Sequence, residues 1–302
     1  DPQACRDRHQ SRVAIRAAAG AGRSQIVSEP VALITGCRSG FGLLAAVSAA
    51  KAGYVVYAGL RDVSTAENLR AAAGDLPVHP IQLDVTSAED RDAAVARIMD
   101  ERGRLDGLVN NAGVALGGFL EQVDEDEFRR LMDVNLFGVF SLTNKALPAM
   151  RAQGSGAIVN ISSTSGRMAI PGLGAYAASK WALEGMSEAL RHEVRSFGVR
   201  VVLIEPGPYR TDMLNRNRTV SRRAADPGPY KAMTDAIDAL SRKVSAKAAD
   251  PQEVADRIVG ALQGRAKALR YPMGPNVRAR LVLRDFMPFG VMETVMARLL
   301  RG

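Results

Sequence analysis

Short apolar runs that alternate with longer helical patterns are the feature that most constrains the fold of this chain, and they begin at Pro30. The runs are rich in Val, Ile and Leu and hold few polar residues, so strands made from them bury both faces. Strands of this kind, separated by helices, form a parallel sheet through right-handed crossovers. The sequence therefore predicts an α/β protein, a single doubly wound Rossmann-type domain with helices on both faces of the sheet.

Seven strands are predicted for this sheet. The first six are expected at Val31–Thr35, Tyr54–Ala58, Val78–Leu83, Leu105–Asn110, Gly156–Ile161 and Val199–Glu205. The helices between them are expected at Phe41–Lys51, Thr65–Ala73, Ala88–Glu101, Asp124–Met150 and Ala175–Phe197. A helix over Pro251–Gln263 and a strand near Ala268–Tyr271 complete the seven-stranded sheet.

Three segments lie outside this pattern. Residues 1–29 show no apolar periodicity and are predicted to be a poorly ordered extension, which leaves residues 30–302 as the folded domain. The polar segment over about 209–250 is expected to be an irregular lid over a substrate. The tail over about 272–302 contains Met and Phe residues in Phe286–Leu300 that are expected to form an adaptable apolar cover.

The net charge of +8 is unevenly distributed along the chain. Residues 209–302 carry 18 basic and 9 acidic side chains, whereas residues 30–208 carry 17 and 20. The basic excess is predicted to be a solvated surface, with an anionic membrane or a phosphate-bearing substrate as alternatives. No nucleic-acid-binding module is present in the sequence, so no nucleic-acid partner is expected.

Other sequence properties bear on membrane contact, disulfides, metal binding and the location of the protein. No apolar run reaches about 18 residues, so no integral membrane contact is expected. Cys5 and Cys37 lie in unlike contexts and the three histidines are scattered, which predicts neither a disulfide framework nor a metal site. A cytoplasmic location is the expectation that follows.

A glycine-rich turn, TGCRSGFG, follows the first strand and leads directly into a helix. Glycines let the backbone turn tightly and let a diphosphate approach without a Cβ in the way. The helix N-terminus offers unpaired N–H groups and a positive dipole end to the phosphates. This strand–turn–helix context, with the spacing TGxxxGxG, predicts a dinucleotide site. Its candidate cofactor contacts are Gly36, Arg38, Ser39, Gly40, Phe41 and Gly42.

The end of the second strand indicates which nicotinamide cofactor is bound. An NAD-preferring site usually places an acid there, on the ribose hydroxyls. This strand ends without one, and Arg61 follows it. Because a guanidinium pairs with a 2′-phosphate, NADP(H) is predicted, with Arg61 and Arg38 as candidate ligands. In the alternative, NAD(H) binds, both arginines are exposed to solvent, and Asp62 binds the ribose.

Later strand ends add further candidate contacts. Asp84 and Val85 close the third strand, and the Asp84 carboxylate is expected to contact the adenine amine. Asn111, Ala112 and Gly113 follow the fourth strand, where small residues let the backbone pass close to the cofactor.

The segment YAASK places Tyr176 and Lys180 at the start of a helical pattern. Residues four apart share a helix face, so the phenol and the ammonium project the same way. A free phenol has a pKa of about 10, and a fixed positive charge nearby is expected to lower it. Tyr176 would then serve as general acid for carbonyl reduction and general base for alcohol oxidation.

Ser163 lies at the end of the fifth strand, 13 residues before Tyr176. A hydroxyl at the carboxyl end of a parallel strand points into the crevice where such sheets bind ligands. Ser163 is therefore a candidate for stabilising charge on a substrate oxygen.

Several segments of the chain resemble the motifs of the short-chain dehydrogenase/reductase family and occur in the usual order of that family. They are TGCRSGFG, NNAG, the Asn135 of DVNLFG, ISSTSG, YAASK and Pro206-Gly207. The match runs from about residue 30 to 211. The resemblance implies an oxidoreductase acting on CH–OH groups, with a catalytic tetrad of Asn135, Ser163, Tyr176 and Lys180, in which Asn135 holds a water that connects Lys180 to solvent. Tyr176 and Lys180 also count as cofactor contacts.

The resemblance also implies that Pro206 and Gly207 lie against the nicotinamide and that the Thr211 hydroxyl contacts the diphosphate. One position departs from the family pattern. Members that prefer NADP more often place the basic residue where this chain has Ser39, which leaves Arg61 a firmer candidate than Arg38.

The loop sequence is similar to the branch of the family that contains hydroxysteroid and retinol dehydrogenases, which implies a bulky apolar alcohol or ketone as substrate. Family precedent also implies a homodimer or homotetramer, built through the helices within Asp124–Met150 and Ala175–Phe197. The alternatives are a non-catalytic NADP(H) sensor or scaffold, and a different reaction on the same fold. Candidate pocket residues are Leu116, Phe119, Met168, Ile170 and Leu173.

Overall fold

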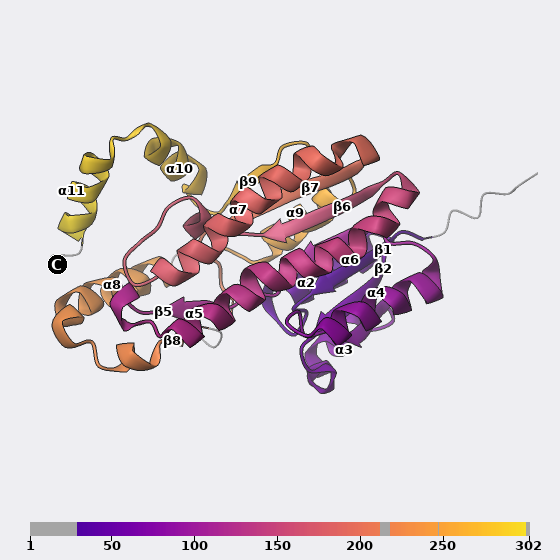
Figure 1. The fold of residues 1–302 in the computed structure, drawn as a ribbon, viewed down its shortest axis with the longest axis horizontal. Coiled ribbons are helices and arrows are strands. Elements are labelled where there is room, and N and C mark those ends of the chain that lie inside the picture. The colour runs from indigo at the N-terminus through magenta and orange to yellow at the C-terminus, as the bar shows by residue number, and fades with distance from the viewer. Residues whose placement is uncertain (1–28, 212–217, 247, 300–302) are drawn as a thin grey trace, which may run out of the picture.

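The computed structural model describes residues 29–211, 218–246 and 248–299. Its centre is a parallel sheet with the order β3-β2-β1-β4-β6-β7-β9, so the predicted seven-stranded Rossmann-type fold is confirmed (Figure 1). The strands are β1 (Val31–Thr35), β2 (Val55–Leu60), β3 (Val78–Gln82), β4 (Gly107–Asn110), β6 (Gly156–Ile161), β7 (Val199–Pro206) and β9 (Arg270–Met273).

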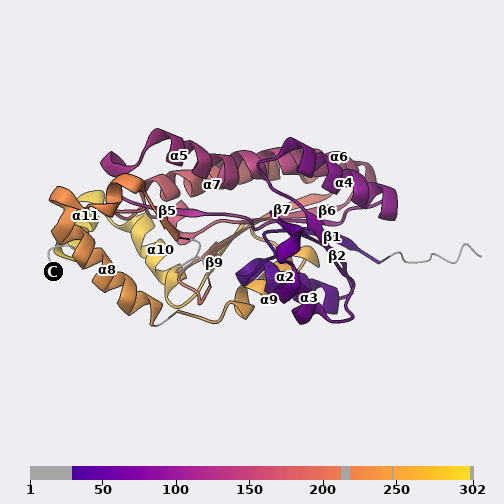
Figure 2. The same ribbon diagram turned by 90° about the horizontal axis from the view of Figure 1, so that it is seen from below.

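Helices cover both faces of the sheet, as its fully buried strands require (Figure 2). On one face, α2 (Gly40–Lys51), α3 (Glu67–Ala73) and α9 (Gln252–Leu262) pack on the sheet through Ala-rich and aliphatic surfaces. On the other face lie α4 (Ala88–Arg102) and the long α6 (Gly138–Gln153). The helix α7 (Gly174–Val194) joins this second layer.

The strand order reverses beside β1, because the chain builds β2 and β3 on one side and then returns to β4 on the other. Such a reversal opens a crevice beyond the carboxyl ends of the strands. The glycine-rich turn after β1 and the NNAG segment after β4 meet there. Leu33 pairs with Leu108 in the register of these two strands.

The helix expected over Asp124–Met150 contains a change in winding. It begins as α5 (Glu125–Met132), passes through a π-helical segment at Asp133–Phe137, and continues as α6. Single π turns within α-helices occur often at functional sites. Here the segment contains Asn135.

The expectation of an irregular segment between Tyr209 and Asp250 was wrong. A helix, α8 (Lys231–Ser245), occupies much of it, and Met233, Ile237 and Leu240 repeat there at the spacing of one helix face. A short strand, β8 (Arg218–Val220), pairs in parallel with β5 (Ala115–Gly117) in a second sheet. Three-residue strands are too short to show a period in the sequence.

Two further helices follow the last strand, α10 (Val277–Phe286) and α11 (Phe289–Leu299). They form an arm that reaches beyond the end of the sheet (Figure 1). Within the described part of the chain, no helix is both long and apolar enough to cross a membrane. The extension predicted for residues 1–29 lies, except for Glu29, outside the described residues.

Candidate active site

The glycine turn after β1 is packed so closely that side chains have no room at two of its positions. Gly36 has a φ of +72°, and a Cβ there would lie 2.9 Å from the Cα of Ala112. A Cβ on Gly42 would overlap the carbonyl oxygen of Gly36 and the side-chain amide of Asn111. The two glycines therefore serve the close packing of the turn against the strand end of β4.

Hydrogen bonds from the β4 end fix this turn. The side-chain Nδ2 of Asn111 donates to the carbonyl of Thr35 at 2.8 Å and to that of Gly36 at 3.2 Å. The Thr35 hydroxyl accepts from the backbone N–H of Asn111 and of Ala112, at 3.0 and 2.9 Å. Asn111 thus holds the shape of the turn, a role that its position in the sequence did not indicate.

The N-terminus of α2 is open toward the crevice. Its N-cap residue, Ser39, makes no side-chain capping hydrogen bond, and no acidic residue lies in the first turn. The methyl and Cβ of Thr211 lie near Gly40, where an added Cβ would be 3.6 Å away. Free N–H groups, a positive helix end and a neighbouring hydroxyl residue fit the diphosphate of a dinucleotide. Phe41, the next residue, packs edge-on against the ring of Tyr209.

Arg38 and Arg61 are both exposed and lie near the same carboxylate. Their charges help to lower the pKa of Asp62, although its hydrogen bonds with Ser64 are the larger cause. The carboxylate accepts from the Ser64 N–H and hydroxyl, at 3.0 and 2.6 Å. Asp62 therefore caps the turn after β2, while the two guanidinium groups make no hydrogen bond within the described residues.

The residues after β3 are held by their own turn. The Asp84 carboxylate accepts from the N–H and hydroxyl of Thr86, at 2.9 and 2.7 Å. Val85 is buried, and its carbonyl accepts from the Arg91 guanidinium at 2.6 Å. Asp84 keeps one carboxylate oxygen free of these contacts.

Three of the four candidate catalytic side chains meet where β6 and α7 approach each other. Tyr176 lies in the first turn of α7, and its phenol is hydrogen-bonded with the hydroxyl of Ser163, which follows β6. The Ser163 hydroxyl also accepts from the Ser165 N–H at 3.1 Å. The Nζ of Lys180, one turn along α7, lies 5.8 Å from the centre of the Tyr176 ring.

Lys180 is a buried ammonium, with 4% of its surface exposed. Its Nζ donates to the carbonyl of Ile161 at 2.9 Å. Burial lowers the pKa of Lys180 to about 8, and the nearby charge of Glu184 opposes that decrease. Gly113 leaves space beside it, because a Cβ there would be 3.6 Å from Nζ and 3.3 Å from the Oδ1 of Asn135. The side chains of Asn135 and Lys180 therefore both lie beside Gly113.

The side chain of Asn135 is fully buried and held on three sides. Its Oδ1 accepts from the Val114 N–H at 2.9 Å, and its Nδ2 donates to the Val114 carbonyl at 2.9 Å. Nδ2 also donates to the Ser179 hydroxyl at 3.0 Å, which in turn donates to the carbonyl of Tyr176 at 2.7 Å. Ser179 thus connects Asn135 to the backbone of Tyr176. In the sequence, only the position of Ser179 within YAASK could have indicated this link between Asn135 and Tyr176.

The expected decrease in the pKa of Tyr176 is not found. Burial raises the pKa of this phenol above its ordinary value, and the hydrogen bond with Ser163 only partly opposes the increase. The physical reason is desolvation: the ring is 7% exposed, and an anionic oxygen there loses its water. Lys180 directs its Nζ to a backbone carbonyl instead of the phenol oxygen.

Pro206 ends β7, and Gly207 follows it next to Thr164, in the loop after Ser163. The Gly207 N–H donates to the carbonyl of Met273 at 2.9 Å, and a Cβ on Gly207 would lie 2.6 Å from the Cγ2 of Val277. The start of α10 therefore packs directly on the segment next to the site.

A buried charge cluster that the sequence did not indicate lies behind Lys180. Glu205 has no exposed surface, and its nearest guanidinium nitrogens, on Arg167 and Arg270, lie 3.6 Å away. Arg270 also binds Glu184 at 2.9 Å. Burial and the Glu184 charge raise the pKa of Glu205 to about 7, against the effect of the two arginines. The cluster connects Lys180 to the loop after Ser163.

An apolar groove of about 410 Å³ opens beside the first turn of α7, within the range of about 300–1,000 Å³ common for small-molecule sites. Phe119 and Ile170, two of the candidate pocket residues, line it together with Tyr230. The rings of Phe119 and Tyr230 stack at 4.3 Å. Its lining includes Gly174 but none of the four candidate catalytic residues, so the groove lies beside these residues and does not contain them. Leu116 packs with Tyr176 in a small apolar cluster. Leu173 pairs with Gly118 in an isolated parallel β-bridge.

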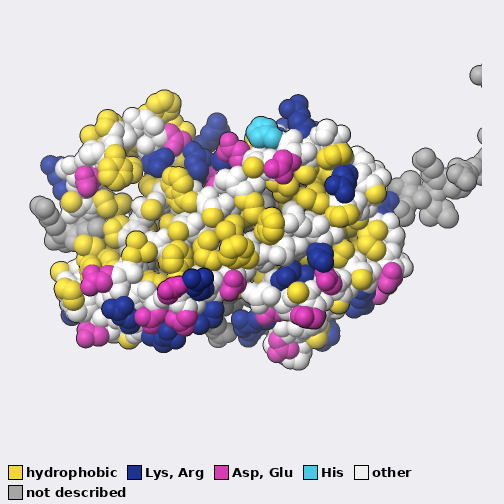
Figure 3. All heavy atoms as spheres, viewed as in Figure 1, with side chains coloured by type: hydrophobic (Ala, Val, Ile, Leu, Met, Phe, Trp, Pro, Cys, Tyr) yellow, Lys and Arg dark blue, Asp and Glu magenta, His cyan; other side chains and the backbone are white. Residues whose placement is uncertain are grey.

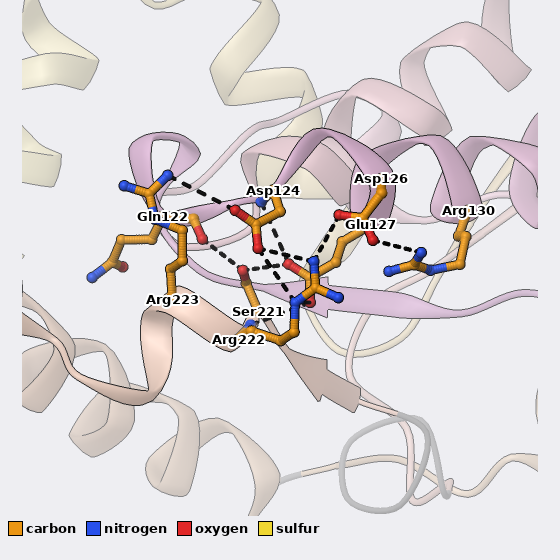
Figure 4. Close-up of polar contacts among 8 residues, drawn as sticks. All are labelled: Gln122, Asp124, Asp126, Glu127, Arg130, Ser221, Arg222 and Arg223. Carbon is orange, nitrogen blue, oxygen red and sulfur yellow. Dashed lines mark hydrogen bonds and ion pairs between the residues drawn. The ribbon is translucent and has the colours of Figure 1, made fainter.

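A polar cluster fastens the segment after β8 to the start of α5 (Figure 4). The guanidinium of Arg222 pairs with Asp124 at 3.0 Å and with Asp126 at 2.7 Å. The hydroxyl of Ser221 lies 2.6 Å from both the Gln122 carbonyl and the Glu127 carboxylate. This Arg222 cluster holds the segment that carries Tyr230 near the groove.

Comparison with known proteins agrees with the observed fold. A family model described as short chain dehydrogenase matches residues 30–221. The 3-ketodihydrosphingosine reductase of Bacteroides thetaiotaomicron is 34% identical over 264 residues, or 87% of this chain and 95% of the relative. Human 17-beta-hydroxysteroid dehydrogenase type 1 is 37% identical over 254 residues, or 81% and 77%. A short-chain dehydrogenase structure from Streptomyces avermitilis is similar with a TM-score of 0.71 at 36% identity, covering 89% of this chain and 96% of that chain.

Proposed function

Because the chain belongs to the short-chain dehydrogenase/reductase family, whose members are NAD(P)(H)-dependent oxidoreductases acting on alcohol and ketone groups, we propose that it interconverts a bulky apolar ketone and its alcohol with NADP(H), using Tyr176 as proton donor or acceptor. The observation that carries the proposal is the convergence of Ser163, Tyr176 and Lys180 beside the glycine turn.

The nicotinamide, when bound, supplies or accepts the hydride. In the direction of reduction, the Ser163 hydroxyl binds the substrate oxygen and stabilises the negative charge that develops on it. The Tyr176 phenol then donates its proton to that oxygen, which gives the alcohol. Oxidation runs the same steps in reverse, with the phenolate taking the proton.

Lys180 and Asn135 restore the proton of Tyr176 in this proposal. A pKa of about 8 lets the Lys180 ammonium release and regain a proton near neutral pH. Val114 and Ser179 hold the Asn135 side chain beside Gly113, the residue that the Lys180 Nζ also approaches. A water held there would connect Lys180 to solvent.

The preference for NADP(H) is supported by the free guanidinium groups of Arg61 and Arg38 at the edge of the nucleotide site. Asp62, the acid that would bind a ribose diol, is engaged by Ser64. Since a charge-assisted contact contributes about 1.5–3 kcal/mol, Arg61→Ala should weaken NADPH binding roughly tenfold or more. Binding of NADH, which lacks the 2′-phosphate, should change by less than about twofold. Fluorescence titration of both cofactors tests this, and equal weakening would contradict the NADP(H) assignment.

The size and apolar character of the substrate are supported by the groove lined by Phe119, Ile170 and Tyr230. The names of two relatives point the same way, since one reduces 3-ketodihydrosphingosine and the other acts on a hydroxysteroid. The Arg222 cluster attaches the first part of the proposed lid over residues 209–250 to α5. A small polar ketone would leave the groove unfilled.

We also propose that the protein is a homodimer or homotetramer associating through α5, α6 and α7. Phe137 and Phe140 are about half exposed at the start of α6, and Trp181 is exposed on α7. Exposed aromatic side chains on neighbouring helices are typical of contact surfaces. Size-exclusion chromatography with light scattering tests the proposal, and a monomer at micromolar concentration would contradict it.

The overall test of activity is the absorbance of reduced nicotinamide in the presence of a panel of ketones and alcohols. Oxidation of NADPH by long-chain or polycyclic ketones, faster than by short polar ketones, is the expected result. Cofactor binding without turnover of any carbonyl or alcohol would favour the sensor or scaffold alternative.

A further inference from the structure

The arm formed by α10 and α11 exposes large apolar side chains that nothing in the described chain covers. Phe286 is 85% exposed and Phe289 is 73% exposed, one on each side of the turn between the helices. Side chains of this kind are usually buried unless they contact a partner or a membrane. The exposed apolar residues of the arm are Val282, Leu283, Phe286, Phe289, Val291 and Val295.

The helix α10 has two apolar faces with different surroundings. Val277 and Leu281, one turn apart, are buried against the body of the protein. Val282, Leu283 and Phe286 share the opposite face, because positions three and four apart are neighbours on a helix. One face therefore anchors the helix, and the other points away from the domain.

Arginines flank the outward face. At about 100° per residue, Arg278 and Arg280 lie on its two sides. Neither guanidinium group makes an ion pair or a hydrogen bond within the described part of the chain. The arm as a whole, residues 277–299, carries four arginines and two acidic residues. Figure 3 shows hydrophobic and basic side chains side by side on this part of the surface. An apolar helix face bordered by arginines is typical of helices that lie in a lipid–water interface.

The arm is attached beside the candidate active site. Val277 packs on Gly207, and Asp285 pairs with Arg167, in the loop after Ser163, at 2.6 Å. The guanidinium of Arg284 lies 5.4 Å from the ring centre of Trp181, which is itself exposed on α7. A surface that covers the arm would therefore lie next to the candidate active site.

We propose that the arm binds the surface of an anionic lipid membrane, with the Phe286–Phe289 turn inserted among the lipids and Arg278 and Arg280 on the phosphate headgroups. A second copy of the chain fits this surface less well, because it would bury both unpaired guanidinium groups. The inference extends the proposed function but is independent of it, since lipid binding is measured without turnover.

Co-sedimentation of the protein with vesicles tests the proposal. We expect binding to vesicles of equal parts phosphatidylcholine and phosphatidylglycerol, and at least about tenfold weaker binding to phosphatidylcholine alone. Phe286→Ser combined with Phe289→Ser should weaken binding by about tenfold or more. Arg278→Gln combined with Arg280→Gln should weaken it similarly and remove most of its salt dependence.

Phe197→Ser is the matched control. Phe197 is 43% exposed but precedes β7, at the end of the sheet away from the site, so its replacement should leave lipid binding unchanged. Circular dichroism checks that the arm variants remain folded. No binding of the parent protein to anionic vesicles would overturn the proposal, as would equal binding by the phenylalanine variants. A dimer that dissociates only in the Phe286/Phe289 variant would assign the surface to a second copy and also overturn it.

Discussion

The glycine turn and the C-terminal arm lie at the same end of the sheet, but they are held in different ways. The turn is fixed by backbone contacts that exclude a Cβ and by partly buried hydrogen bonds that Asn111 donates to Thr35 and Gly36. The arm is attached through one packed face of α10 and the ion pair of Asp285. The first region is preorganised for one ligand, whereas the second can adapt to its surroundings. The candidate catalytic residues lie between the two.

Tyr176→Phe should have the largest effect and tests whether chemistry belongs to the preorganised region. The variant keeps the buried ring but removes the hydroxyl that meets Ser163. We expect kcat to fall by about 10²–10⁴-fold, the usual contribution of a general acid. Cofactor affinity, measured by fluorescence titration, should stay within about twofold. Retention of full activity would remove Tyr176 from the mechanism.

Gly42→Ala tests whether the glycine turn after β1 is too rigid to accommodate a Cβ, as its contacts indicate. The new Cβ would overlap the Gly36 carbonyl and the Asn111 amide, so the turn must shift. We expect a loss of about 3 kcal/mol or more in the free energy of unfolding, and weaker NADPH binding. The measurements are urea denaturation and cofactor titration.

The matched control for this change is Gly185→Ala in α7, another helical glycine. Nothing lies within 4 Å of an added Cβ at Gly185. The control should be neutral or more stable by about 0.5–1 kcal/mol, because alanine favours a helix. If the two substitutions had the same effect, the turn would be adaptable and the comparison would fail.

The same contrast separates what the sequence predicted from what it could not. The buried strands and the order of the motifs are local properties, so the sheet and the grouping of Ser163, Tyr176 and Lys180 were predictable. The role of Asn111 was not, because its partners Thr35 and Gly36 lie more than 70 residues away. In the sequence, Glu205 is an ordinary residue at the end of a strand. Its ion pairs with Arg167 and Arg270, which lie in distant segments of the chain, are visible only in the structure.

The substrate side was predicted less well for a related reason. The apolar spacing in α8 was visible in the sequence, but the polar residues around it favoured an irregular segment. The pairing of β5 with β8 joins Ala115 to Arg218, across about a hundred residues and without a local pattern. Where packing is sparse, local sequence constrains structure least.

Glu205→Gln tests the buried charges behind Lys180 through pH. The pKa of Glu205 is raised from 4.5 to about 7, so the folded chain holds a proton that the unfolded chain releases. The stability linked to this proton is fully present below about pH 4.5 and is lost as the pH rises through 7. Glutamine mimics the protonated acid at every pH and does not titrate.

The free energy of unfolding of the Glu205→Gln variant, relative to the parent, should therefore rise between pH 5 and pH 8.5 by up to about 3 kcal/mol. Urea denaturation at several pH values measures this difference. A variant that became relatively less stable as the pH rose would show that Arg167 and Arg270 outweigh burial and the charge of Glu184. In that case the cluster would be a stabilising ion-pair network.

Arg222→Ala should have the smallest effect and tests how firmly the adaptable side is held. The Arg222 side chain is 61% exposed, so its pairs with Asp124 and Asp126 should contribute no more than about 1 kcal/mol to stability. Loosening the segment that carries Tyr230 should instead raise KM for a bulky ketone by about two- to fivefold, with kcat nearly unchanged. Arg129→Ala, which removes an exposed pair with Glu125 on α5, is the control and should leave KM unchanged. An equal fall in kcat and kcat/KM would place the Arg222 cluster with the preorganised region, because the lid would then be part of the catalytic geometry.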